Sequence, residues 1–351
     1  MLNSNDNSFN FKKRLSRRQL LTGMAVASGA CVAGMNYFPR FFPPKFNIEP
    51  VFIAKAGSYD ESIEKIILLG LSELGITKNE IMGKSVLLKP NLVEPHVSAN
   101  HINTHPKVIA GAIEAFKILG AAEVLVGEGS GHRMDSLLIL EMTGYIDMLR
   151  HFRTKFLDLN RGDIFLKNNL GNYTAMKKLV FSKELKRIDI IVSMAKMKTH
   201  HWVGATLSMK NLFGIMPGSC YGWPKNVLHF AGIEESILDI NATIKPQLAI
   251  VDGIVGMEGD GPIMGQPVDA KVLVMGKNLP AVDATCSRIM GLNPFKIKYL
   301  KASEKILGQI REEKIEQIGE IIKSVKKNFA LIEKIPSHKG LRLGLKENEK
   351  N

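Results

Sequence analysis

The side chains best suited to chemistry gather in one stretch, residues 193–219, which directly follows a short apolar, β-branched run at 188–192. Such a run is typical of a buried strand, because parallel strands are covered on both faces. In open α/β sheets, ligands bind beyond the carboxyl ends of the strands. Cations and imidazoles at that position indicate a site for an anion. The stretch supplies these candidates: Lys196, Lys198, His200, Lys210 and Asn211.

Residue type suggests a role for each candidate. A lysine is a compact point charge that suits a carboxylate or phosphate, and its pKa falls readily on burial. Imidazole titrates near neutral pH and can act as a general acid or base. The alternative is a solvated basic loop over a core of Met, Trp and Phe, with each histidine a core or capping residue. We predict Lys210, His200 and His229 as catalytic residues, and Lys89, Asn91, Lys196, Lys198 and Asn211 as ligand-binding residues.

A glycine-rich turn at residues 127–133 is a second candidate for anion binding. It follows a predicted strand at 122–126 and precedes a predicted helix at 135–144, and backbone amides in such a turn can face an anion. The turn lacks the G-x-G-x-x-G spacing, so dinucleotide binding is not predicted. Its Glu128 and His132 are ligand-binding candidates, with capping of the following helix as an equal alternative.

Three acids lie among glycines at the end of a predicted strand, residues 247–251. Hard divalent cations take such oxygen ligands, although the spacing is not diagnostic. The alternative is a tight surface loop with helix-capping acids. The candidate metal ligands are Asp252, Glu258 and Asp260.

The cysteines set limits on other cofactors. The chain has Cys31, Cys220 and Cys286, and no two of them have C-x-x-C spacing. This excludes a self-contained cysteine-ligated iron–sulfur cluster or zinc ribbon. A disulfide between Cys220 and Cys286 stays open, because sequence alone does not fix pairing. Apart from a divalent metal, the sequence names no cofactor.

The elements that must position these side chains alternate between strands and helices. A strand at 85–89, a helix at 104–119 and a strand at 122–126 form a unit that implies parallel pairing with a right-handed crossover. We therefore predict an α/β fold, a mostly parallel sheet with helices on both faces and Rossmann-like strand–helix–strand units. Further predicted elements are a helix at 60–75, a hairpin turn at 171–173, a helix from His229 to 244, a strand at 271–275 and a helix holding Asp283 that ends at Gly291.

The ends of the chain are basic. The formal net charge is +13, and residues 1–45 contain seven lysines and arginines but one aspartate. Residues 16–21, Ser-Arg-Arg-Gln-Leu-Leu, precede an uncharged apolar run and resemble a twin-arginine export signal, with an uncleaved membrane anchor as the compatible alternative. A lysine/glutamate amphipathic helix is predicted at 311–329. The expected regions are a signal or anchor with linker at 1–45, an α/β domain at 46–310, and a helix and basic tail at 311–351.

Several short motifs, in this order, resemble the domain-of-unknown-function family 362 over roughly residues 50–310. Many relatives in that family also have a ferredoxin-like set of cysteines, which this chain lacks, so the resemblance does not imply iron–sulfur electron transfer. It implies a fold class and little about function. The motifs are Lys89-Pro90-Asn91, Thr104-His105-Pro106, Lys196-Met197-Lys198-Thr199-His200, Ser208-Met209-Lys210-Asn211-Leu212-Phe213-Gly214, Asp252-Gly253, Gly256-Met257-Glu258-Gly259 and Ala281-Val282-Asp283-Ala284.

A fainter similarity, in motif order, is to the lactate racemase family. In that family a lysine holds a nickel-pincer cofactor and histidines act as acid and base. This chain lacks the arginine of the family's first motif and has a longer spacing from the lysine to the proline. The corresponding positions here are Asn91, His132, His200, Lys210 with Pro217-Gly218, and His229.

Three functional interpretations follow. The first is an exported enzyme that acts on a small anionic substrate, with a racemase-like reaction as one form of it. The second is a non-catalytic, cofactor-carrying or redox accessory protein at the membrane, and the third is a scaffold. Whether the chain is an enzyme therefore stays open at the level of sequence. The expected partners are a small anionic ligand, the twin-arginine machinery and a membrane, and the expected location is the periplasm or the outer face of the cytoplasmic membrane. Nucleic acid is not expected, because the chain has no nucleic-acid-binding motif.

Overall fold

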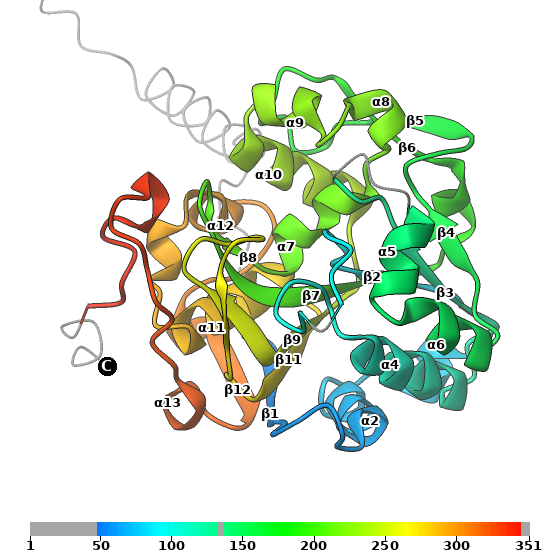
Figure 1. Ribbon diagram of the computed structural model, residues 1–351, viewed down its shortest axis with the longest axis horizontal. Helices are drawn as coiled ribbons and strands as arrows, with labels where there is room; N and C mark the ends of the chain where they lie inside the picture. The colour runs from blue at the N-terminus through cyan, green and yellow to red at the C-terminus, as the bar shows by residue number, and fades with distance from the viewer. Residues whose placement is uncertain (1–47, 98, 132–135, 345–351) are drawn as a thin grey trace, which may run out of the picture. The chain divides into compact units, whose positions relative to one another are not determined.

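A mixed ten-stranded sheet forms the centre of the protein, seen in a computed structural model that describes residues 48–97, 99–131 and 136–344 (Figure 1). Strands pair in the order β12-β1-β11-β9-β7-β2-β3-β4, with β8 added to β7 and β10 added to β9. The bounds are β1 Glu49–Lys55, β2 Ser85–Pro90, β3 Glu123–Glu128, β4 Phe156–Asp158, β7 Ile190–His200, β8 Gly204–Thr206, β9 Leu248–Glu258, β10 Gln266–Val268, β11 Val272–Gly276 and β12 Ile315–Gly319.

Parallel pairing dominates the part of the sheet from β9 to β4. The pairs β9–β7, β7–β2, β2–β3 and β3–β4 are all parallel, whereas β11 runs antiparallel to both β9 and β1. The carboxyl ends of β2, β3, β7 and β9 therefore lie at one edge of the sheet. This confirms the predicted α/β fold with a mostly parallel sheet.

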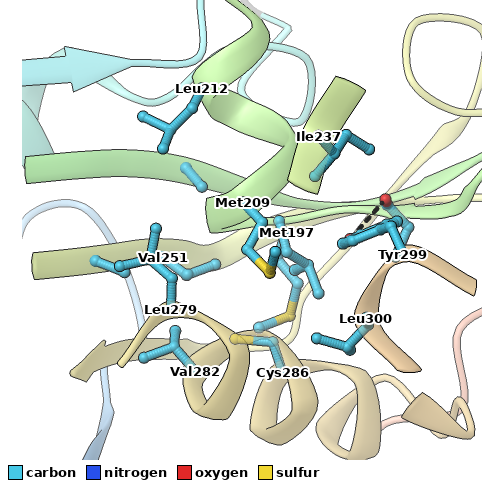
Figure 2. Close-up of a cluster of buried hydrophobic side chains, with 14 of the residues drawn as sticks. Met197, Met209, Leu212, Ile237, Val251, Leu279, Val282, Cys286, Tyr299 and Leu300 are labelled. Atoms are coloured by element: carbon cyan, nitrogen blue, oxygen red, sulfur yellow. Dashed lines mark hydrogen bonds between the residues drawn. The ribbon is translucent and has the colours of Figure 1, made fainter. Parts of the chain in front are cut away.

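Helices cover both faces because side chains alternate along each strand. On β2, Val86 and Leu88 pack into one core with α2, α4, α5 and α6, whereas Leu87 packs into the other with α7, α10, α11 and α12. Figure 2 shows the second core, in which Met209, Ile237, Val282 and Tyr299 come from those four helices. The helix bounds are α2 Ile63–Glu73, α3 Lys78–Ile81, α4 Pro106–Ile118, α5 Ser136–Met142, α6 Tyr145–His151, α7 Ser208–Asn211, α8 Gly218–Tyr221, α9 Asn226–Phe230, α10 Ile233–Ile244, α11 Leu279–Ile289, α12 Lys298–Ser303 and α13 Ile322–Val325.

Local sequence signals explain several of these boundaries. Helix α4 begins with Pro106 after the capping residue His105, whose Nδ1 accepts a hydrogen bond from the Lys107 amide at 3.1 Å. The predicted hairpin turn at 171–173 is confirmed by the antiparallel pair β5 Ile164–Asn168 and β6 Lys178–Ser182, which forms a separate small sheet. Asp283 on α11 accepts hydrogen bonds from the amides of Ser208 and Met209, and so holds the start of α7.

Three predicted elements are wrong. Strand β7 continues to His200, so the basic residues lie on the strand itself and not in a loop after it. The pattern from His229 is split between α9 and α10, because Gly232 separates them with φ 106°. The amphipathic helix predicted at 311–329 does not form: its first half is β12, which pairs in parallel with β1 and buries Ile315.

Two sequence predictions concern the ends and the cysteines. The proposed export signal and anchor at 1–45 lie outside the described residues. No helix within the described ranges is long and apolar enough to span a membrane. Cys220 is exposed and Cys286 is buried, and both are free thiols, so the disulfide left open above does not form in this structure.

Candidate functional site

A cavity of about 670 Å³ opens at the sheet edge where β2, β3 and β7 end. This is where the topology of a parallel sheet predicts a ligand site, because loops leaving neighbouring strands diverge there. Most of the residues proposed from sequence line it: Lys89, Asn91, Glu128, Lys198, His200, Lys210, Asn211 and His229. Residues distant in sequence therefore meet in one cleft, as predicted.

Lys89 has its hydrogen-bonding capacity filled by the protein. Its Nζ donates to Glu128 Oε2 at 2.6 Å, to the Pro90 carbonyl at 2.6 Å and to Asn211 Oδ1 at 3.1 Å. An ammonium has three donors, so none is left for a ligand. Lys89, Glu128 and Asn211 therefore form a buried wall of the cavity, and the ligand-binding role of Lys89 stays a prediction.

Gly214 explains how this wall packs so closely. A Cβ at this position would collide with the Glu128 carboxylate and come 2.8 Å from Lys89 Nζ. The Gly214 carbonyl also accepts a hydrogen bond from the Gly129 amide at 2.8 Å. Only glycine lets the backbone after α7 lie against the ion pair.

Lys198 is buried on β7 with no carboxylate partner among the described residues. Its Nζ donates to the carbonyls of Ile102, at 2.9 Å, and Pro262, at 3.0 Å. Burial lowers its pKa well below the ordinary lysine value, and the charges of Lys196 and Lys210 lower it further. One N–H is left that makes no hydrogen bond within the described part of the chain, in a residue that lines the cavity.

Lys210 is the least restrained cation of the site. It is half-buried at the end of α7, and its Nζ lies 3.9 Å from the centroid of the Phe213 ring. Across residues 48–97, 99–131 and 136–344, its ammonium makes no hydrogen bond or ion pair. Burial lowers its pKa to about 7, and the charge of Lys89 acts in the same direction. Near neutral pH this side chain can be either an ammonium or an amine.

His200 and His229 are held in opposite tautomers by backbone groups. Nδ1 of His200 lies 3.0 Å from the Trp202 amide, which can only donate, so in the neutral ring the proton is on Nε2. Nδ1 of His229 lies 3.0 Å from the Lys225 carbonyl, which can only accept, so that proton is on Nδ1. Burial and the charge of Lys210 lower the pKa of both rings. One neutral ring keeps an N–H donor at Nε2, and the other keeps a basic lone pair.

Lys225 lines the cavity and was missed by the sequence analysis. Its Nζ donates to Asn160 Oδ1 and to the Met216 carbonyl, and burial lowers its pKa to about 8. The residue follows Trp223 and Pro224 and has φ 70°, a backbone conformation that sequence does not reveal for a lysine. Phe213, which contacts both Lys210 and His229, was also not predicted.

Lys196 is not among the residues that line the cavity, so the cavity gives no support to its predicted ligand-binding role. It is fully buried and lies 2.7 Å from Asp252 Oδ2 and 2.8 Å from the Tyr59 hydroxyl. Tyr59 in turn donates to Asp252 at 3.1 Å and stacks on the His105 ring, with centroids 3.7 Å apart. This closed network holds β9 and α4 against β7.

The predicted metal ligands do not come together. Asp252 belongs to the buried pair with Lys196, and Glu258 accepts a hydrogen bond from the Ala330 amide at 2.7 Å. Asp260 lies 3.3 Å from His201 at the cavity rim. No group of three His, Cys, Asp or Glu side chains in the described part of the chain could hold a metal ion. His132 lies outside the described residues.

The fold and cavity define an α/β protein whose sheet edge presents lysines and two histidines of opposite tautomer to one small chamber. The chain belongs to the family described as Domain of unknown function (DUF362), whose model matches residues 86–288. That range contains every residue assigned here to the cavity wall from β2, β3, β7 and α7. It confirms the family resemblance seen in the motifs.

Two kinds of relative have been found. Over 267 residues the chain is 27% identical to the thylakoid-associated protein sll1697 of Synechocystis sp., covering 74% of this chain and 80% of that protein. The lactate racemase apoprotein of Thermoanaerobacterium thermosaccharolyticum superposes with a TM-score of 0.44 at 15% identity, over 71% of this chain. A protein from Thermotoga maritima gives 0.38 at 13%, over 67%. The alignments span 58% and 60% of those two structures, and the motif-order similarity to lactate racemases stays a prediction.

Proposed function

We propose that this protein is an enzyme that binds a small carboxylate or phosphate in the cavity and moves a proton on it. Lys198 supplies an N–H donor for the anion, whose negative charge favours the protonated form of this lysine, and Lys210 aids binding when it is protonated. His229 acts as the base and His200 as the hydrogen-bond donor. The observation that supports this best is the pairing of two histidines with opposite tautomers beside cations that lack carboxylate partners among the described residues.

Two of the three described acids that line the cavity have partners: Glu128 pairs with Lys89, and Asp260 faces His201 at the rim. The third acid is Glu94, and no ion pair joins it to Lys198. An anion that enters can therefore replace the missing partner of Lys198. Because the Lys198 side chain is buried, such a charge–charge contact is stronger than on the surface.

The binding step is tested with acetate, phosphate and pyruvate, by calorimetry on wild-type protein and the Lys198→Met variant. Loss of one charged contact in a buried site weakens binding by about tenfold or more, which corresponds to about 1.4 kcal/mol. Lys301→Met removes an exposed lysine of α12 and serves as the matched control, with unchanged affinity expected. If all three anions bind the wild type no better than Lys198→Met, the proposal is wrong.

The proton-transfer step is tested by deuterium uptake from heavy water into a bound anion, followed by NMR. His229→Gln keeps a side chain of similar size but removes the base, so we expect binding to persist while exchange falls by about 10²-fold or more. Equal exchange rates in the two proteins would leave a binding protein, the accessory function considered above, as the better description.

We also propose membrane association and twin-arginine export. The Ser-Arg-Arg-Gln-Leu-Leu sequence at 16–21 supports export, and the printed name of the Synechocystis relative, thylakoid-associated, supports a location at a membrane. Replacing Arg17 and Arg18 by lysine in the full chain should retain the protein in the cytoplasmic fraction. Unchanged fractionation would contradict the export route.

A further inference from the structure

We propose that Lys210 is a nucleophile that forms an imine with the carbonyl carbon of an aldehyde or ketone that also bears the anionic group. This rests on the proposed function and narrows its substrate class to small oxo acids and their phosphate counterparts. Lys198 would hold the anionic end of the molecule, and Lys210 would meet its carbonyl end.

The division of labour among the cavity lysines supports this assignment. Lys89 has three partners, and Lys198 and Lys225 each have two oxygen partners. These amines are fixed in position by the acceptors around them. Lys210 Nζ has no such acceptor within the described ranges and rests on the face of Phe213. It is therefore the amine of the cavity that can move onto a carbon atom without breaking a hydrogen bond.

The surroundings of Lys210 also favour a neutral amine. The charged or titratable groups that act on it or lie beside it are Lys89, Glu128, Lys198, His200 and His229. Burial is the largest cause of the lowered pKa, and Glu128, the acid that acts on Lys210, is paired with Lys89. With a pKa of about 7, a large fraction of Lys210 is unprotonated near neutral pH, whereas an exposed lysine is almost fully charged.

The two histidines complete the reaction. His229 Nε2 takes one proton from the Lys210 ammonium, and the freed lone pair of Nζ forms a bond to the carbonyl carbon while the carbonyl π electrons move to oxygen, which accepts a hydrogen bond from His200 Nε2–H. The His229 imidazolium protonates that oxygen, and its Nε2 then takes a second proton from the positively charged Nζ to give the neutral carbinolamine. His229 returns this proton to the hydroxyl, which leaves as water while the Nζ lone pair forms the C=N bond. Overall, the lysine ammonium and the carbonyl compound give a protonated imine and one water, with no oxidant or reductant.

The experiment uses the purified protein with glyoxylate, the smallest anionic aldehyde, and sodium cyanoborohydride. Reduction of the imine adds the mass of glyoxylate less one oxygen atom to the modified lysine, and peptide mapping gives the rate at each site. Exposed lysines in the same sample are the internal reference. Because the fraction of neutral amine is far greater for a lysine of pKa about 7, Lys210 should be modified at least about tenfold faster than exposed lysines at pH 7.

Further variants separate reactivity from anion binding. Lys198→Met should slow modification of Lys210 by glyoxylate but not by acetaldehyde, which has no charge for Lys198 to hold. Lys210→Arg should lose the fast adduct while binding acetate, and the control Lys301→Arg should keep it. Modification of Lys210 at the rate of exposed lysines overturns the imine proposal. If acetate binding persists in that case, the anion site survives; if acetate does not bind at all, the proposed function fails as well.

Discussion

Two lysines on one strand, Lys196 and Lys198, show how the same side chain becomes structural in one place and available in another. Both are fully buried and lie on the same face of β7, because they are two positions apart on the strand. Lys196 meets Asp252 and Tyr59 in a closed network, whereas Lys198 meets two backbone carbonyls and the cavity. The difference lies in the partners and not in the burial.

The pairing of β7 with β9 creates this difference. Lys196 lies opposite Asp252, but an irregularity follows, and Lys198 lies opposite Met257. The strand that gives one lysine a counter-ion therefore gives the next an apolar neighbour. A buried charge without a counter-ion is costly, and this cost lowers the pKa of Lys198 well below the ordinary lysine value. We interpret the Lys196 region as scaffold and the Lys198 region as site.

The largest loss of stability should come from removing Asp252 from its network with Lys196 and Tyr59. Asp252→Ala leaves Lys196 buried without a counter-ion and should lower the free energy of unfolding by about 3–5 kcal/mol. Urea denaturation measures the change. Lys198→Met, two positions along the strand, removes no ion pair and should change stability by less than about 1 kcal/mol. Equal losses in the two variants would refute the contrast between scaffold and site.

A second closed pair lies in the cavity wall, and Gly214→Ala tests it. The added Cβ would collide with the Glu128 carboxylate and crowd Lys89. Overpacking of this kind should cost about 1–3 kcal/mol, measured by thermal or chemical unfolding. Gly83→Ala is not a suitable control, because that glycine has φ 75°; Gly344→Ala is, because a Cβ added there would have no other atom within 4 Å. If Gly214→Ala were as stable as the wild-type protein, the cavity wall would be less rigid than described.

The titration of Lys210 in the cavity should make the free energy of unfolding depend on pH. Its pKa is about 7 when folded and about 10.4 in an unfolded chain, so between these values the unfolded state binds more protons. Stability relative to Lys210→Met should therefore rise as pH increases from about 7 to 10, by at most about 1.4 kcal/mol per pH unit. Below about pH 7 the difference should be constant. Parallel curves for the two proteins throughout this range would contradict the lowered pKa.

Much of the fold could be predicted, because it depends on local patterns. The strand at 85–89 and the helix after Pro106 have clear signals of hydrophobic spacing and capping. The helix predicted at 311–329 was wrong because the lysines and glutamates there suit an exposed helix, whereas Ile315 and Ile318 also suit a strand. Pairing with β1, far away in sequence, decided between them, and no local signal reveals such a partner.

The location of the site was predicted more accurately than the roles of its residues. Topology alone places the ends of β2, β3 and β7 together, and so brings Lys89, Lys198 and Lys210 to one cavity. Hydrogen-bond partners depend on register and side-chain geometry. Sequence could therefore not show that Glu128 neutralises Lys89, that Asp252 neutralises Lys196, or that Lys225 enters the cavity.

The smallest effect is a change in proton position, and it tests the histidines without altering the protein. Nitrogen-15 NMR of imidazole-labelled protein should find His200 protonated at Nε2 and His229 at Nδ1, as the Trp202 amide and the Lys225 carbonyl require. Burial lowers both pKa values, so neither ring should become charged until the pH is below the ordinary value near about 6.5. Identical tautomers at His200 and His229 would remove the asymmetry on which directed proton transfer depends, while leaving the contrast between Lys196 and Lys198 intact.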